Sequence, residues 1–242
     1  SEAEKLEIVR TVNDVRNGEK FIVGGVDSSS VTETIRLAED LVDAGAEMIR
    51  IRIPRLAPDV SAYFEQVVPR VPAPVVIIHQ MAPGMFAGGE APVGAEPEVI
   101  GDLIDIDNVW GYIASGNVRF EARVRNFVTT DKPFWLGNGL IVLAMSAIGA
   151  NGACLMYGNV GPGDVLQIIS NVMNGDLKTA QEIQTRIIEA DHQILSRGAA
   201  GIKAALDILG YDGGAPRSPN PAVSDGDREI IRAAMGAAGL GG

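Results

Sequence analysis

Short apolar segments alternate with helical segments along most of this chain, and no other feature restricts the possible folds as strongly. Strand candidates recur about every 25 residues, each followed by a segment with apolar residues at helical spacing. Ser1 with Glu4 and Ser30 with Glu33 form Ser-x-x-Glu capping boxes that begin two of these helices. This alternation predicts a parallel sheet covered by helices, built from six strand–helix units. The strand candidates are 21–26, 48–54, 75–81, the first part of 109–117, 133–136 and 153–157.

The last quarter of the chain has a different pattern. After residue 175 the sequence predicts helices and no strands: a long helix to about residue 196, another near 199–209, and a final helix over 225–238. We therefore expect two parts, which are β/α barrel units over residues 1–175 and a C-terminal helical extension over residues 176–242.

The composition excludes several classes of protein. Apolar residues make up 46% of the 242 residues, enough for a substantial core, and the formal net charge is −11. Because the 20 basic residues are scattered, nucleic acid is not expected as a partner. Cys154 is the only cysteine, and no short-spaced histidine or carboxylate pair indicates a metal, so no cofactor is expected. The longest apolar stretch, 140–150, is too short to span a bilayer, and no leader-like segment opens the chain, which predicts a cytoplasmic protein without a membrane partner.

Several motifs in order along the chain resemble those of the dihydrodipicolinate synthase/N-acetylneuraminate lyase family. They are GGVDSSS, DAGAEMIRIRIP, PVVIIHQMAPG, NVWGYIASGN, GNG and GYDGG. The resemblance implies an α/β fold, the aldolase-type (β/α)8 TIM barrel, in which catalytic side chains lie at the carboxyl ends of the strands. Residues 1–16 match the helix after the family's second strand, so the sequence supplies strands 3–8 and only six of the eight units. Either the chain is a fragment, which we favour, or a neighbour supplies the missing part, or the sheet closes differently.

The family's chemistry depends on a lysine that this sequence does not have at the matching position. In the family, that lysine ends a strand, is followed closely by Ala-Ser-Gly, and forms a Schiff base with a 2-oxo acid. Here 114–116 keeps Ala-Ser-Gly, and Tyr112 or Ile113 holds the lysine position, depending on where a single-residue deletion is placed. No lysine occurs between Lys20 and Lys132, so we expect no Schiff-base chemistry.

The proton relay of the family is also altered. Its Tyr-Asn-x-Pro-Gly pattern matches residues 79–84, with His79 at the tyrosine position, and Met85 stands where an arginine often grips a substrate carboxylate. The second relay tyrosine normally follows the proline that ends an earlier strand, but Arg55 and Leu56 follow here. The threonine pair of the relay belongs to the absent second strand.

The remaining candidates form a predicted ligand site. His79 and Tyr112 end consecutive strands, which are neighbours in a barrel, so we expect them to converge and to act as catalytic acid–base groups. A structural, hydrogen-bonded His79 is the alternative. Arg52 would add a positive charge if it faces the barrel interior, and whether Arg50 and Arg52 face the interior or the helices stays open. The predicted ligand-binding residues are Arg52, Ser28, Asn138 and Tyr157.

Three hypotheses follow for the function. The protein is a carbon–carbon or carbon–oxygen lyase of small oxo acids that uses His/Tyr acid–base chemistry, or a non-catalytic homologue that binds a small acid or assembles with an active relative, or an incomplete polypeptide. In the first two cases we expect a small carboxylate or 2-oxo acid as ligand. The resemblance implies self-association as a homodimer or homotetramer.

Overall fold

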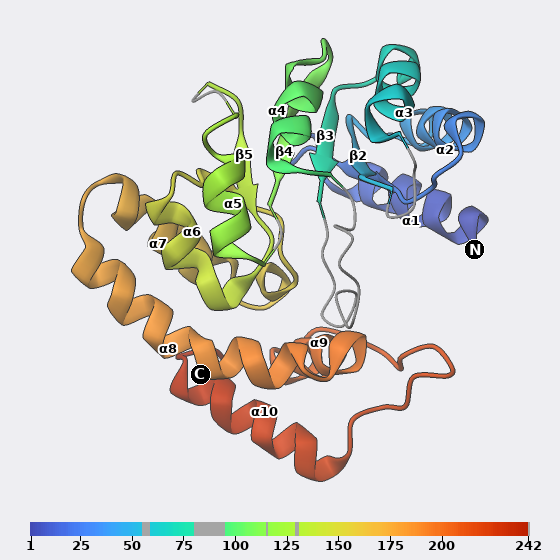
Figure 1. Ribbon diagram of the computed structural model, residues 1–242. Helices are drawn as coiled ribbons and strands as arrows, with labels where there is room; N and C mark the ends of the chain where they lie inside the picture. The colour runs from blue at the N-terminus through green and yellow to red at the C-terminus, as the bar shows by residue number, and fades with distance from the viewer. Residues whose placement is uncertain (55–58, 80–94, 115, 129–130, 242) are drawn as a thin grey trace, which may run out of the picture. The chain divides into compact units, whose positions relative to one another are not determined.

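The computed structural model describes residues 1–54, 59–79, 95–114, 116–128 and 131–241, and Figure 1 shows the arrangement of its elements. Six strands among these residues form one sheet in the order β1-β2-β3-β4-β5-β6, and β1 to β4 pair in parallel, as do β5 and β6. The predicted α/β class and the six strands are confirmed. The described residues do not form a full (β/α)8 barrel, because a closed barrel of this type requires eight strands. The strands are β1 (Val23–Val26), β2 (Met48–Arg52), β3 (Val75–Ile78), β4 (Val109–Ile113), β5 (Phe134–Leu136) and β6 (Gly152–Ala153).

The chain divides into two compact units, Ser1–Phe134 and Trp135–Gly242. This division falls inside β5, and the boundary predicted between residues 175 and 176 stays a prediction.

The first unit holds β1 to β4, and a helix follows each of these strands (Figure 1). The helix α1 begins with the predicted capping box, in which Ser1 and Glu4 satisfy each other's backbone donors. The Ser30 side chain likewise accepts a hydrogen bond from the Glu33 amide at the start of α2. The helices are α1 (Glu2–Val15), α2 (Val31–Asp43), α3 (Val60–Val67), the 3₁₀ turn η1 (Val68–Arg70), α4 (Pro97–Asp105) and α5 (Val118–Val124).

The two faces of this sheet differ, and strand pairing shows which residues share a face. Consecutive residues of a strand point to opposite faces, and register partners on parallel strands point to the same one. A Cβ on Gly24 would lie 3.2 Å from Leu41 of α2, so helices cover the face of Gly24, which we call the helix face. Gly25 and its partner Arg50 point to the opposite face, and so does Arg52 two residues further, so we call it the arginine face. The sequence left open whether Arg50 and Arg52 face the helices or the opposite side of the sheet. In the structure both point away from the helices.

The second unit holds most of β5, β6 and the C-terminal helices. The apolar stretch that begins at residue 140 lies in a 3₁₀ turn, η2 (Gly139–Ile141), followed by a short helix, α6 (Val142–Ala147). Long helices follow, and α8, α9 and α10 form the orange-to-red part of Figure 1. They are α7 (Pro162–Met173), α8 (Leu177–Leu195), α9 (Gly198–Ile208) and α10 (Asp225–Ala237).

The strand predicted over 153–157 is wrong beyond Ala153. The chain leaves the sheet there and forms the 3₁₀ turn η3 (Met156–Asn159), in which the Asn159 side chain donates to the Met156 carbonyl at 2.8 Å. Tyr157 lies in this turn with its side chain buried, and a Cβ on Gly161 would lie only 2.7 Å from its ring. This close packing of the backbone against the ring requires the turn and ends the strand early.

Candidate functional site

Two arginines and one aspartate form a charged cluster at the carboxyl ends of β1 and β2. Arg50 Nη1 donates to Asp27 Oδ1 at 2.8 Å, and Arg52 Nε lies 3.0 Å from the same oxygen without the alignment of a hydrogen bond. Burial alone would raise the pKa of Asp27, but the hydrogen bond from Arg50 and the charges of both arginines lower it overall. The cluster therefore holds two cations and one ionised carboxylate.

Hydroxyl groups behind the cluster fix the loop that carries Asp27. Tyr63 of α3 donates its hydroxyl to the Ser28 carbonyl at 2.8 Å, and the Thr34 hydroxyl of α2 lies 2.7 Å from that of Tyr63. Thr34 is completely buried and Tyr63 nearly so. The Ser28 hydroxyl, predicted as a ligand-binding group, accepts a hydrogen bond from the Ser30 amide within this loop. The loop thus presents Asp27 to the arginines from a rigid base.

Tyr112 and His79 both point toward α5. Tyr112 is fully buried, and its hydroxyl donates to Glu121 Oε2 at 3.1 Å, a carboxylate that is itself fully buried. Burial and the adjacent Glu121 charge raise the pKa of Tyr112 well above its ordinary value. The His79 ring is 2% exposed and lies 5.0 Å from the ring of Phe120, centroid to centroid.

His79 and Tyr112 share one face of the sheet, as expected of a convergent pair, but Arg52 does not join them. Tyr112 is the register partner of Ile77, which lies on the helix face, and His79 follows Ile77 by two residues on the same face. The structure therefore brings His79 and Tyr112 to one face and leaves Arg52 on the other. The roles predicted for these residues in catalysis and binding stay predictions.

The same pairing distinguishes the two candidates for the family's lysine position. Ile113 is the partner of Ile78, which is in turn the partner of Arg52, so Ile113 points to the arginine face while Tyr112 does not. The register of β4 shifts by one residue against β3 between Val109 and Gly111. Because β4 has one extra residue at this point, each later residue of β4 points to the face opposite the one it would take without the shift.

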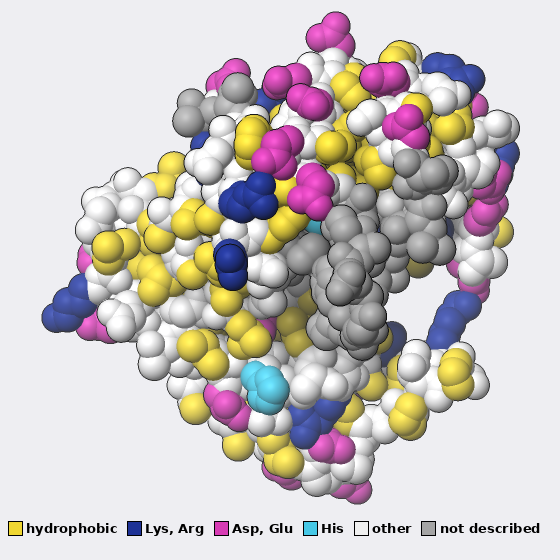
Figure 2. Space-filling model, in the orientation of Figure 1, with side chains coloured by type: hydrophobic (Ala, Val, Ile, Leu, Met, Phe, Trp, Pro, Cys, Tyr) yellow, Lys and Arg dark blue, Asp and Glu magenta, His cyan; other side chains and the backbone are white. Residues whose placement is uncertain are grey.

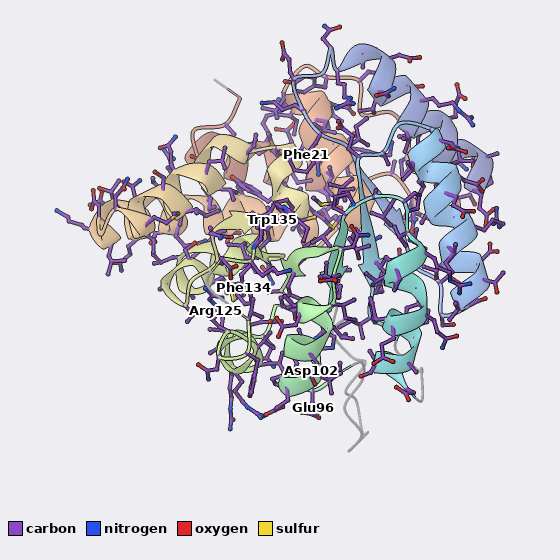
Figure 3. All side chains as sticks on the ribbon, turned by 90° about the horizontal axis from the view of Figure 1, so that it is seen from above. Phe21, Glu96, Asp102, Arg125, Phe134 and Trp135 are labelled. Carbon is purple, nitrogen blue, oxygen red and sulfur yellow. The ribbon has the colours of Figure 1, made fainter. Side chains whose placement is uncertain are left out.

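Aromatic packing continues from Tyr112 to the beginning of β5. The ring of Phe134 lies 5.6 Å from that of Tyr112, centroid to centroid. The guanidinium of Arg125 lies over Phe134, 5.4 Å from its centroid, and Figure 3 labels these two residues. This stacking fixes the tyrosine ring on the helix face.

The two site residues predicted in the second unit have different surroundings. The Asn138 side chain accepts a hydrogen bond from the Leu140 amide and caps η2. The Tyr157 hydroxyl is buried without a hydrogen-bond partner among the described residues, and burial together with the Asp164 and Asp191 charges raises its pKa. A Cβ on Gly139 would lie 2.3 Å from Asp191 Oδ1 and 3.3 Å from the Tyr157 side chain, so these three residues are neighbours.

Some expectations concern residues outside those that the structure describes. They are residues 80–84 of the relay motif, Met85, Arg55, Leu56 and Ser115. Within the described ranges, no three histidine, cysteine, aspartate or glutamate side chains gather as a metal site would require. No helix in the same ranges has the length and apolar character needed to cross a bilayer.

Sequence reasoning missed Asp27 as a functional candidate. Two signals could have found it: Asp27 directly follows a strand, and the next strand carries an Arg-Ile-Arg pattern. Strands that are consecutive in a parallel sheet end at the same edge, so an acidic residue there is a natural partner for both arginines.

Known proteins similar to this chain agree on one family. A sequence profile described as the dihydrodipicolinate synthetase family matches residues 1–238. A 4-hydroxy-tetrahydrodipicolinate synthase of an Exiguobacterium species is 26% identical over 218 residues, which are 88% of this chain and 72% of that relative.

Solved structures share the fold. Dihydrodipicolinate synthase of Thermotoga maritima is similar with a TM-score of 0.85 at 19% identity. The match covers 99% of this chain and 82% of the Thermotoga chain. Dihydrodipicolinate synthase of Cyanidioschyzon merolae, solved with lysine bound, has a TM-score of 0.85 at 22% identity, with 99% of this chain and 81% of that chain covered. These likenesses establish an aldolase-type α/β fold.

Proposed function

The chain belongs to the dihydrodipicolinate synthetase family, and from this premise we propose that it is an aldolase-like scaffold for small 2-oxo acids that works without a Schiff-base lysine. The proposal is carried by the absence of an amine at the carboxyl end of β4 (Val109–Ile113). Both residues that align with the family's lysine there, Tyr112 and Ile113, are buried and carry no amine. A Schiff base requires an amine at the reacting carbon.

The other lysines of the first unit support the proposal. Lys132 Nζ donates to the Val109 carbonyl at 2.6 Å, at the beginning of β4 and therefore at the strand end opposite Ile113. Lys5 belongs to α1, where its charge acts on Asp27, and Lys20 is exposed after that helix. In the sequence, none of the three directly follows a strand, and none lies on β4, where the family's lysine is expected.

We expect no covalent adduct when the protein is incubated with pyruvate and borohydride and its intact mass is measured. A family member that has the lysine is the positive control, and the Ile113→Lys variant tests the position, because this residue points to the arginine face. An adduct in that variant but not in the parent protein would agree with the proposal. A stoichiometric adduct on the parent protein would contradict it.

The proposal does not depend on His79 and Tyr112 as proton-transfer groups. Both lie on the helix face, and Tyr112 is engaged with the buried Glu121. The cytoplasmic localisation expected from the sequence stays a prediction.

We also propose that the protein self-associates as a homodimer or homotetramer. Apolar side chains are exposed in the second unit, and Figure 2 shows yellow surface in the region of α6, α7 and α8. Leu166 and Met173 of α7 are 65% and 67% exposed, and their spacing of seven residues puts them on one helix face. Such exposed apolar surface is typical of an interface between subunits.

Sedimentation at micromolar concentration should therefore show a dimer or tetramer. The double variant Leu166→Glu/Met173→Glu should shift the protein toward the monomer, while Ile230→Glu on the exposed side of α10 serves as the matched control. A well-behaved monomer of the parent protein would contradict the proposed assembly.

A further inference from the structure

We propose that Arg50, Asp27 and Arg52 form a carboxylate-binding subsite on the arginine face, in which Arg52 grips the carboxylate of a 2-oxo monoacid. This inference rests on the proposed function, because that function supplies the class of ligand. The subsite lies where β1 and β2 end, the edge at which proteins of this architecture bind their ligands.

The charge of the cluster suits one carboxylate. Two guanidinium groups share a single ionised aspartate, and Lys5 adds a further positive charge to its surroundings. Among the residues that the structure describes, neither arginine has a second acidic partner. The cluster therefore carries a net positive charge that a small anion can neutralise.

The two arginines have different tasks. Arg50 is the more buried, donates to Asp27, and lies over Gly25, where a Cβ would be only 2.5 Å from its Nη2 atom. Arg52 approaches Asp27 through Nε alone, and its two Nη atoms make no hydrogen bond with any described residue. Its side chain is 26% exposed, against 17% for Arg50, and we infer that a solute reaches Arg52 more readily. The guanidinium fork fits a carboxylate with two parallel hydrogen bonds.

The side chains beside Arg52 favour a monoacid over a dicarboxylate. Ile78 is the register partner of Arg52, and Ile113 is the partner of Ile78, so the arginine face becomes apolar next to the guanidinium. A short apolar chain such as that of pyruvate can pack against Ile78, which is half-buried. A second carboxylate there would lose its hydration without gaining a partner.

Ligand-observed NMR titrations with pyruvate, propionate and succinate test the subsite in the full-length protein. Arg52→Ala should weaken the binding of pyruvate and propionate by about tenfold or more, because a charge-assisted hydrogen-bond pair is lost. Arg36→Ala is the matched control, since Arg36 carries the same charge but pairs with Glu2, Glu33 and Asp40 on the outside of α2. Asp27→Asn should tighten binding, because the competing anion is removed, and the parent protein should bind succinate more weakly than propionate.

The outcomes separate the subsite from the proposed function. Pyruvate binding that is equal in the parent protein and in Arg52→Ala would overturn the subsite and leave the 2-oxo acid function standing. Arg52-dependent binding of propionate, with no gain for pyruvate, would support the subsite and overturn the 2-oxo acid function. Binding of none of the three acids would overturn the inference. Equal or weaker binding by Asp27→Asn would overturn the role given to Asp27.

Discussion

Asp191→Asn should stabilise the second unit by about 2 kcal/mol at pH 8. Asp191 of α8 is 1% exposed, and its Oδ1 atom has no hydrogen-bond partner among the described residues. Burial raises its pKa to about 6, although the charge of His192 opposes the change. Because one pKa unit corresponds to about 1.4 kcal/mol, the buried carboxylate destabilises the folded state once it ionises. An amide of the same shape removes that charge.

The pH dependence follows from the direction of the pKa change. The pKa of Asp191 is higher in the folded than in the unfolded protein, so its favourable contribution is complete below about pH 4 and is lost as the pH rises through about 6. Urea denaturation of the parent protein and of Asp191→Asn between pH 4 and pH 8 should give free energies of unfolding that diverge across this interval. Asp212→Asn, at an exposed position of the same unit, is the control. Parallel curves for Asp191→Asn and the parent protein would contradict the prediction.

Tyr112→Phe should destabilise the protein by about 2 kcal/mol and leave carboxylate binding unchanged. The substitution keeps the ring against Phe134 but removes a donor that lies 3.1 Å from the buried Glu121 carboxylate. Loss of a hydrogen bond to a buried charged group costs about 1.5 to 3 kcal/mol. Denaturation and pyruvate titration of the same variant measure the two effects separately.

The matched control for this variant is Tyr211→Phe, because Tyr211 is 67% exposed. If Tyr112→Phe kept its stability but lost pyruvate binding, the catalytic role predicted from the sequence would be supported instead. The two results are distinguishable because Arg52 lies on the opposite face from Tyr112.

The local sequence determined the order and the approximate bounds of most elements. The capping residues Ser1 and Ser30 begin helices where predicted, because an N-cap depends only on groups a few residues apart. The strand prediction failed at Tyr157, where the backbone near Gly161 packs against the buried ring. That contact depends on the fold of the turn, which apolar character alone does not indicate.

The motifs of the sequence by themselves determined the family and the α/β fold, and strand spacing determined that Arg52, His79 and Tyr112 come near strand ends. Only the tertiary structure decided which face each side chain takes. Side chains of a strand alternate with a period of two, so the one-residue register shift between β3 and β4 exchanges the positions of Tyr112 and Ile113. Such a shift arises from pairing between strands that are distant in the sequence. For this reason the sequence only predicts Arg52 as a ligand-binding residue, whereas the structure shows that Arg52 and Arg50 share Asp27.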